Sequence, residues 1–233
     1  MGLFNIRDNL SNAIIAGALL GMAHGMSVQA GEDKITKGYN SMDSMGCMLV
    51  RECTKDVKEV FSLLDISSEY SNTEEFTPQA VEFNNLLMSL NQVGSKVFLA
   101  DEKYFPKNHR GVYHTVSNNI YLNKRHMDQP HYLMSVMRHE GWHAAQDCMA
   151  GSIKNSLIAI IHNEEDVPML WRTLAERTYP ASAVPWEAEA GWAGRTEGMT
   201  MKALESCAAG TMWSDYELTP LTRKWLIEEG YID

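Results

Sequence analysis

The pentapeptide His139-Glu140-Gly141-Trp142-His143 constrains this chain more than any other part of its sequence. Apolar residues before and after it recur at helical spacing, so we expect one long helix over residues 129–150. On a helix, His139 and His143 project from one face a turn apart, where two imidazoles can share one tetrahedral Zn²⁺. Glu140 is rotated by about 100° from His139, so we expect it to reach a water at the metal and to act as general base. The alternative is that both histidines are partly buried side chains of a core helix.

A catalytic zinc site needs a third protein ligand and one open position, and residues 185–194 offer two carboxylates. Small residues follow Glu187 at three, four and seven positions, which would let its helix pack closely against the motif helix. Glu189 shares its helix face with bulkier side chains. We therefore predict Glu187 as the third metal ligand and keep Glu189 as the alternative. Both could instead be solvated acidic residues near a helix N-terminus, where the helix dipole favours negative charge.

The motif followed by a later glutamate resembles the thermolysin-like gluzincin metallopeptidases. The run from His139 to residue 151 is similar to the motif helix of that family, and Glu187-x-x-Ala190 is similar to a third-ligand motif of several gluzincin families. The resemblance covers residues 110–195. It implies a zinc peptidase that acts on a peptide or protein substrate, with one Zn²⁺ per chain held by His139, His143 and Glu187 and with Glu140 as base.

The chain departs from that family pattern at Gly191, where related families often carry an acidic residue that holds a zinc histidine. Asp147 and Glu189 are candidates for this supporting role. The group that would stabilise the oxyanion is also open. The candidates for it are Tyr113, His114, Tyr179 and Arg195, although a metal can polarise the carbonyl by itself.

The remaining pattern predicts an α+β fold, a mostly helical zincin-like domain with a small mixed or antiparallel sheet before the motif helix. Residues 96–100 read as a strand and residues 111–122 as a β-hairpin that turns at Ser117-Asn118. An extended substrate could pair with such a hairpin. Further helices are expected over residues 54–64, from Thr77-Pro78 onward, and over residues 155–161, 165–178, 185–209 and 219–229, whereas residues 31–46 read as a loop.

The N-terminus and the four cysteines predict export. Residues 13–23 form an uncharged apolar run followed by Val28 and Ala30, so we expect a signal peptide over residues 1–30 and a single domain over residues 31–233. The alternative is an amphipathic or core-packing first helix. We expect disulfides Cys47–Cys53, because the two are close in sequence, and Cys148–Cys207, which would tie the motif helix to the Glu187 helix. Four buried thiols are the alternative. Export would make the protein secreted or periplasmic.

The net charge of −10 and the lack of a basic stripe argue against a nucleic-acid partner. The apolar run at the N-terminus is too short for a stable membrane span. Two further functions are compatible with the pattern. One is a zinc hydrolase that cuts peptide cross-links in a cell wall, and the other is a zincin-fold binding protein without turnover.

Overall fold

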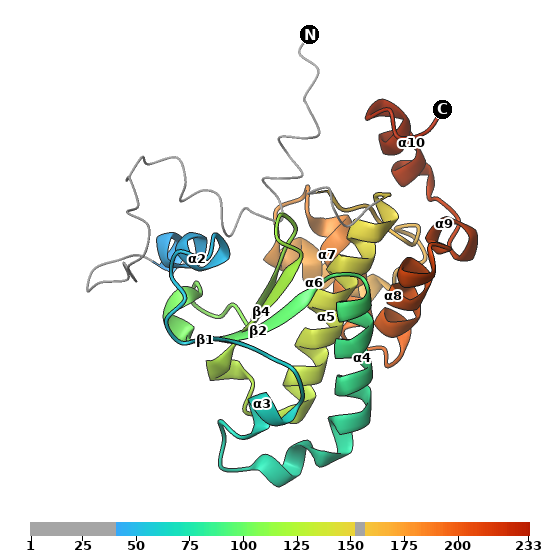
Figure 1. The fold of residues 1–233 in the computed structure, drawn as a ribbon. Coiled ribbons are helices and arrows are strands. Elements are labelled where there is room, and N and C mark those ends of the chain that lie inside the picture. The colour runs from blue at the N-terminus through green and yellow to red at the C-terminus, as the bar shows by residue number, and fades with distance from the viewer. Residues whose placement is uncertain (1–40, 152–156) are drawn as a thin grey trace.

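The computed structural model describes residues 41–151 and 157–233, and its centre is a small sheet against the motif helix (Figure 1). The sheet order is β1-β2-β4-β3. Pairing is antiparallel for β1 with β2, parallel for β2 with β4, and antiparallel for β3 with β4, so β3 is an edge strand. The strands are β1 (Val57–Glu59), β2 (Lys96–Ala100), β3 (Gly111–His114) and β4 (Asn119–Asn123). The predicted α+β class, the strand and the hairpin are confirmed.

Helices make up most of the described chain, and α5 is the one around which the others pack. It contacts α4, α7 and α8 as well as β3 and β4. The α-helices are α2 (Ser41–Leu49), α3 (Leu64–Ser67), α4 (Ala80–Gln92), α5 (Pro130–Met149), α6 (Met169–Thr178), α7 (Val184–Ala193), α8 (Met199–Ala209), α9 (Met212–Asp215) and α10 (Pro220–Glu228). The short 3₁₀ helices are η1 (Thr73–Gln79), η2 (Glu102–Tyr104) and η3 (Lys124–His126).

The sheet separates two hydrophobic clusters. Alternate residues of β2, such as Val97 and Leu99, face the large core formed with α4 and α5. Phe98 points the other way, into a second cluster that α2 covers. Figure 1 shows α2 on the side of the sheet opposite α5. The sheet is thus buried on both faces, and its core face fixes α5 against β3 and β4.

Two predictions near the start of the described chain were wrong. Residues 54–64 do not form a helix but contain β1 and bends, and α2 begins at Ser41 within the segment predicted as a loop. The apolar residues at helical spacing in 54–64 do not share one buried face, because Val60 is buried whereas Phe61 is 73% exposed. The predicted signal peptide over residues 1–30 lies outside the described residues.

Two helix predictions after the motif also need correction. Residues 157–161 are buried but not helical. The single helix expected over residues 185–209 is divided into α7 and α8, and Gly198 at the start of α8 has a φ of +78°. Backbone of this kind favours glycine because it lacks a Cβ. The helices predicted around residues 129–150, 165–178 and 219–229 correspond to α5, α6 and α10.

Both predicted disulfides are present. Cys47–Cys53 closes α2, and Cys148–Cys207 joins the end of α5 to α8, with Cα–Cα distances of 5.2 and 5.8 Å. The second bridge reaches α8 rather than the Glu187 helix α7, because the expected long helix is broken. Disulfides of this kind are typical of oxidising compartments. Across residues 41–151 and 157–233, every helix is too short or too polar to cross a bilayer.

Candidate metal centre

The two motif histidines and Glu187 meet where α7 crosses α5. The imidazoles of His139 and His143 lie edge to face, with ring centroids 5.0 Å apart. Glu187, in the first turn of α7, places one oxygen 3.3 Å from His139 Nε2 and the other 3.8 Å from His143 Nε2. One ligand atom from each residue lies within 4.8 Å of the other two, so this group could hold a metal ion.

The group fits a divalent cation in its chemistry and its spacing. Ligands at about 2.0–2.2 Å from a tetrahedral Zn²⁺ lie about 3.3–3.5 Å from one another, and Glu187 Oε2 lies 3.3 Å from His139 Nε2. Glu187 Oε2 is buried, and His139 Nε2 contacts it at the long distance of 3.3 Å. A contact of that length satisfies a buried carboxylate oxygen only weakly, and a bound cation would satisfy it better.

The three side chains of this group shift one another's pKa values. Burial alone would lower the pKa of His139, but the hydrogen bond to Glu187 and the charges of Glu140 and Glu187 raise it to about 9. Burial opposes ionisation of Glu187, yet both histidines hold its pKa below the ordinary value. The pKa of His143 is lowered, chiefly by burial. These shifts favour a protonated His139 next to an ionised Glu187. A metal ion bound by both residues would displace the proton from His139.

Glu140 lies between this group and the edge strand β3. A Cβ at Gly111 would lie 3.0 Å from Glu140 Oε1, so the glycine leaves room for the carboxylate. The side chain is 7% exposed, and the Tyr113 backbone N–H donates to it. Burial raises the pKa of Glu140 to about 7, and the charge of Glu187 acts in the same direction. A carboxyl that titrates near neutrality is suited to acid–base work.

Glu189, the alternative ligand, is fully buried but lies in a different environment. Its oxygens accept hydrogen bonds from the backbone N–H groups of Ile161 and His162, from the Trp142 indole and from the Gln146 amide. N–H donors therefore occupy the carboxylate that could otherwise serve as a ligand. Burial raises the pKa of Glu189 to about 7, although these donors oppose the shift.

Asp147, the other candidate for supporting a histidine, is also fully buried. One of its oxygens accepts from the Tyr113 hydroxyl at 2.7 Å, and the other has no hydrogen-bond partner within the described part of the chain. Burial raises its pKa to about 9. The structure places Asp147 under β3, so it joins the sheet to α5 rather than orienting a histidine.

Of the four candidates for oxyanion stabilisation, Tyr179 is the one that contacts the metal group. Its hydroxyl hydrogen-bonds Glu187, and the charge of Glu140 acts on it. The Tyr113 hydroxyl is taken by Asp147, and His114 Nδ1 lies 2.8 Å from a serine hydroxyl in its own hairpin. Arg195 lines a separate cavity.

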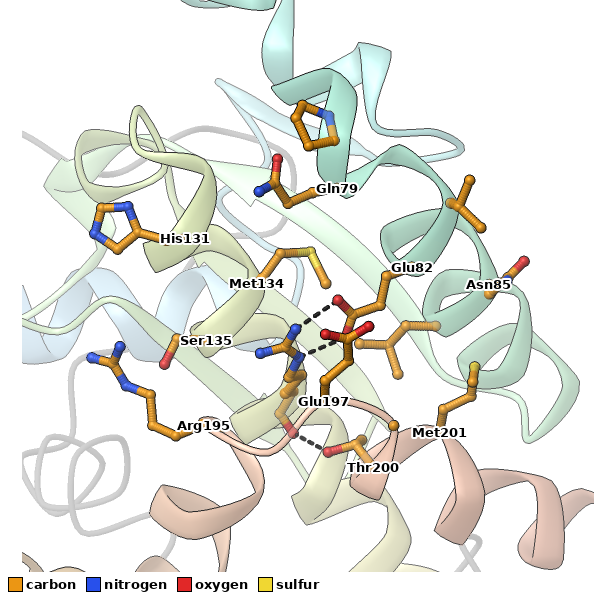
Figure 2. A pocket seen from close by; sticks show the side chains of 16 residues that line it. Gln79, Glu82, Asn85, His131, Met134, Ser135, Arg195, Glu197, Thr200 and Met201 are labelled. Carbon is orange, nitrogen blue, oxygen red and sulfur yellow. Dashed lines mark hydrogen bonds and ion pairs between the residues drawn. The ribbon is translucent and has the colours of Figure 1, made fainter. Parts of the chain in front are cut away.

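That cavity has a volume of about 570 Å³, and its lining includes Arg138, the residue before His139 (Figure 2). The walls come from the end of η1, from α4 and α5, from the segment that joins α7 to α8, and from the start of α8. Arg138 on α5 forms a two-fold ion pair with Glu82 on α4, both contacts at 2.6 Å, and the Thr200 hydroxyl donates to the Arg138 carbonyl at 2.8 Å. These bonds, dashed in Figure 2, hold α4 and α8 on the motif helix.

Two glycines explain how the helices approach so closely. A Cβ at Gly141 would lie 3.0 Å from the Thr200 methyl group, and one at Gly194 would lie 2.9 Å from the Ser135 carbonyl oxygen. The small-residue face predicted for α7 is thus correct at Gly194. Gly191 instead faces Trp171 of α6, whose ring would lie 3.2 Å from a Cβ at that position.

The histidines are oriented by groups that sequence reasoning did not name. The His139 ring donates to the backbone carbonyl of Ala190, and Gln146 Oε1 lies 2.8 Å from His143 Nδ1. Gln146 follows His143 by three positions, a spacing at which helical side chains meet, and that spacing was the available signal. Comparisons with protein-family models, with curated proteins and with solved structures found no match for this chain.

Proposed function

We propose that this protein is a zinc-dependent hydrolase of peptide bonds, of the gluzincin type, with His139, His143 and Glu187 as ligands. The observation that carries the proposal is the position of Glu140. It is the residue after the first ligand, lies against the edge strand, and has a pKa of about 7 beside a His-His-Glu group. A zinc ion bound there would polarise the scissile carbonyl and make water a stronger acid.

The chain's own residues supply the remaining steps. Glu140 takes a proton from the attacking water and later gives it to the leaving amine. Tyr179 is the nearest hydroxyl that can donate a hydrogen bond to the carbonyl oxygen as negative charge develops on it. Burial and neighbouring carboxylates raise the pKa of Tyr179, so it keeps its proton for this role.

An extended peptide is the substrate class that suits the surroundings of Glu140. β3 pairs only with β4 among the described strands, so its other edge can accept a further strand. Gly111 leaves room for the Glu140 carboxylate next to β3. A peptide that pairs with β3 would place its backbone carbonyls next to the reacting groups.

We also propose that the protein works outside the cytoplasm, secreted or periplasmic. The two disulfides support this location, because such bonds persist in oxidising compartments.

The test is hydrolysis of a peptide library that includes branched cell-wall-type cross-links. Zinc-loaded wild-type protein should cleave a subset of peptides, and chelation should stop the cleavage. Glu140→Gln should keep the metal and lose nearly all activity, because an amide cannot accept the proton. Wild-type protein that binds zinc but cleaves no peptide would favour a binding role. Undiminished activity in Glu140→Gln would contradict the proposed base.

A further inference from the structure

Gln146 connects His143 to Glu189. Its Oε1 lies 2.8 Å from His143 Nδ1, and its Nε2 donates to Glu189 Oε2 at 2.7 Å and to the Trp186 carbonyl at 3.2 Å. Gln146 and Glu189 are both completely buried. Water therefore does not compete for these hydrogen bonds, and their geometry is set by the protein alone.

The surroundings decide which way the Gln146 amide points. Glu189 receives the N–H groups of Ile161, His162 and the Trp142 indole, so it acts as an acceptor on every side. The Trp186 carbonyl can also only accept. Both groups next to the Gln146 nitrogen are thus acceptors, and the amide must present its NH₂ to them. Its oxygen is then the atom that faces His143.

This orientation selects one tautomer of the His143 ring. An amide oxygen accepts a hydrogen bond but cannot donate one, so His143 Nδ1 carries the proton. Nε2 is left with its lone pair, and it points towards Glu187. A neutral imidazole binds a metal through such a lone pair, and the hydrogen bond of the other nitrogen fixes which one is free.

We propose that Gln146, held in place by Glu189, is a positioning residue that fixes the tautomer and the ring orientation of His143 for metal binding. The proposal rests on the proposed function and adds to it. Helix α7 then supplies the ligand Glu187, the Ala190 carbonyl for His139 and the Glu189 anchor for His143. The three proposed ligands and the groups that support the histidines thus all come from α5 and α7, at the point where these helices cross.

The first measurement is ¹⁵N NMR of the His143 ring in metal-free protein at slightly alkaline pH. Wild type should show Nδ1 protonated and Nε2 free. Gln146→Leu removes the acceptor, so the ring should lose this preference, and zinc affinity should fall by about 10- to 100-fold. The matched control is Thr200→Val, which removes another buried hydrogen bond to α5 and should leave both readouts unchanged.

The exchange Gln146→Glu with Glu189→Gln tests the direction of the connection. Glutamate at position 146 again offers an acceptor to His143, and glutamine at position 189 offers a donor to the residue at position 146. This double variant should keep the wild-type tautomer and bind zinc at least about tenfold more tightly than Gln146→Leu, as expected if support of the ligand is recovered.

The proposal would be overturned by an Nε2–H tautomer in wild type, or by zinc affinity in Gln146→Leu equal to that of Thr200→Val. Failure of the proposed function has a different signature. If wild type bound no zinc while the His143 tautomer still depended on Gln146, the proposed zinc site would be contradicted and the positioning role of Gln146 would stand.

Discussion

The two buried glutamates of α7 lie on different faces of the helix and have different partners. Glu187 faces His139 and His143, and its oxygens make only long contacts with their Nε2 atoms, at 3.3 and 3.8 Å. Glu189, two positions later, is fully buried, and its oxygens accept hydrogen bonds from four N–H groups. Burial raises the pKa of Glu189 to about 7, whereas the histidines hold that of Glu187 below its usual range.

The difference shows that burial of a carboxylate does not by itself mark a metal ligand. A carboxylate whose oxygens are saturated by N–H donors has no lone pair directed at a cation. A carboxylate between two imidazoles, with only long contacts to them, has lone pairs available for a divalent cation. We therefore propose metal binding for the Glu187 face and structural support for the Glu189 face, and the predictions below test that division.

Replacing Glu187 should have the largest effect. Glu187→Ala removes a charged ligand from a four-coordinate site, so zinc affinity should fall by about a thousandfold or more. Competition with a chromophoric chelator measures it. Wild-type affinity in this variant, with loss in Glu189→Ala, would reverse the division between the two faces.

Tyr179→Phe should lower kcat by about a hundredfold, the typical effect of losing one oxyanion donor. Zinc affinity should stay within a few-fold of wild type, because the ring remains and only the hydrogen bond to Glu187 is lost. Steady-state kinetics with the best library peptide would separate the two effects. An unchanged kcat would remove Tyr179 from the reaction.

Glu189→Ala should mainly destabilise the fold. It leaves the N–H groups of Ile161, His162 and Trp142 without their acceptor, so the free energy of unfolding should fall by about 3 kcal/mol. Zinc affinity should fall by only about 10- to 100-fold, through the loosened Gln146. Urea unfolding and chelator competition on one preparation give both values. A thousandfold loss of zinc with full stability would make Glu189 a ligand.

Asp147 extends the comparison, because this buried carboxyl has a single donor, the Tyr113 hydroxyl. Burial raises its pKa from 3.8 to about 9, so the folded state holds a proton that the unfolded chain releases. Stability should therefore fall as pH rises through this window, by at most about 1.4 kcal/mol per pH unit from this group. Asp147→Asn should make the fall in unfolding free energy with pH less steep above pH 7. In that range Glu140 and Glu189 contribute less to the pH dependence, because their pKa values are about 7. The free energy of unfolding of both proteins would be measured by urea unfolding at several pH values. An equal decrease with pH in wild type and Asp147→Asn would contradict the assignment.

The parts of the fold that the sequence predicts well are those with a long or local pattern. Twenty residues of α5 carry a consistent helical pattern, and the hairpin turn at Asn118 adopts a positive φ of 56°. Residues 54–64 misled because a few apolar residues at helical spacing also suit a short strand, β1, followed by bends. Residues 157–161 are a buried apolar run whose last N–H group bonds to Glu189, a long-range partner that no local pattern shows.

The candidate site shows the same contrast between residues that a local pattern predicts and residues whose partners are distant in the sequence. His139, Glu140 and His143 follow from spacing on one helix, and Glu187 was found because small residues mark a helix that approaches closely. Gln146 was missed because its role depends on a carboxylate that lies 43 positions away along the chain.

The most direct test of the metal centre is zinc content per chain in wild type and in the His139→Ala, His143→Ala double variant. Both proteins would be purified with added zinc, dialysed, and analysed by elemental mass spectrometry, with circular dichroism to confirm folding. We expect about one zinc per wild-type chain, as for a three-ligand site with an open position, and close to none in the double variant. Full zinc content in a folded double variant would contradict the metal centre.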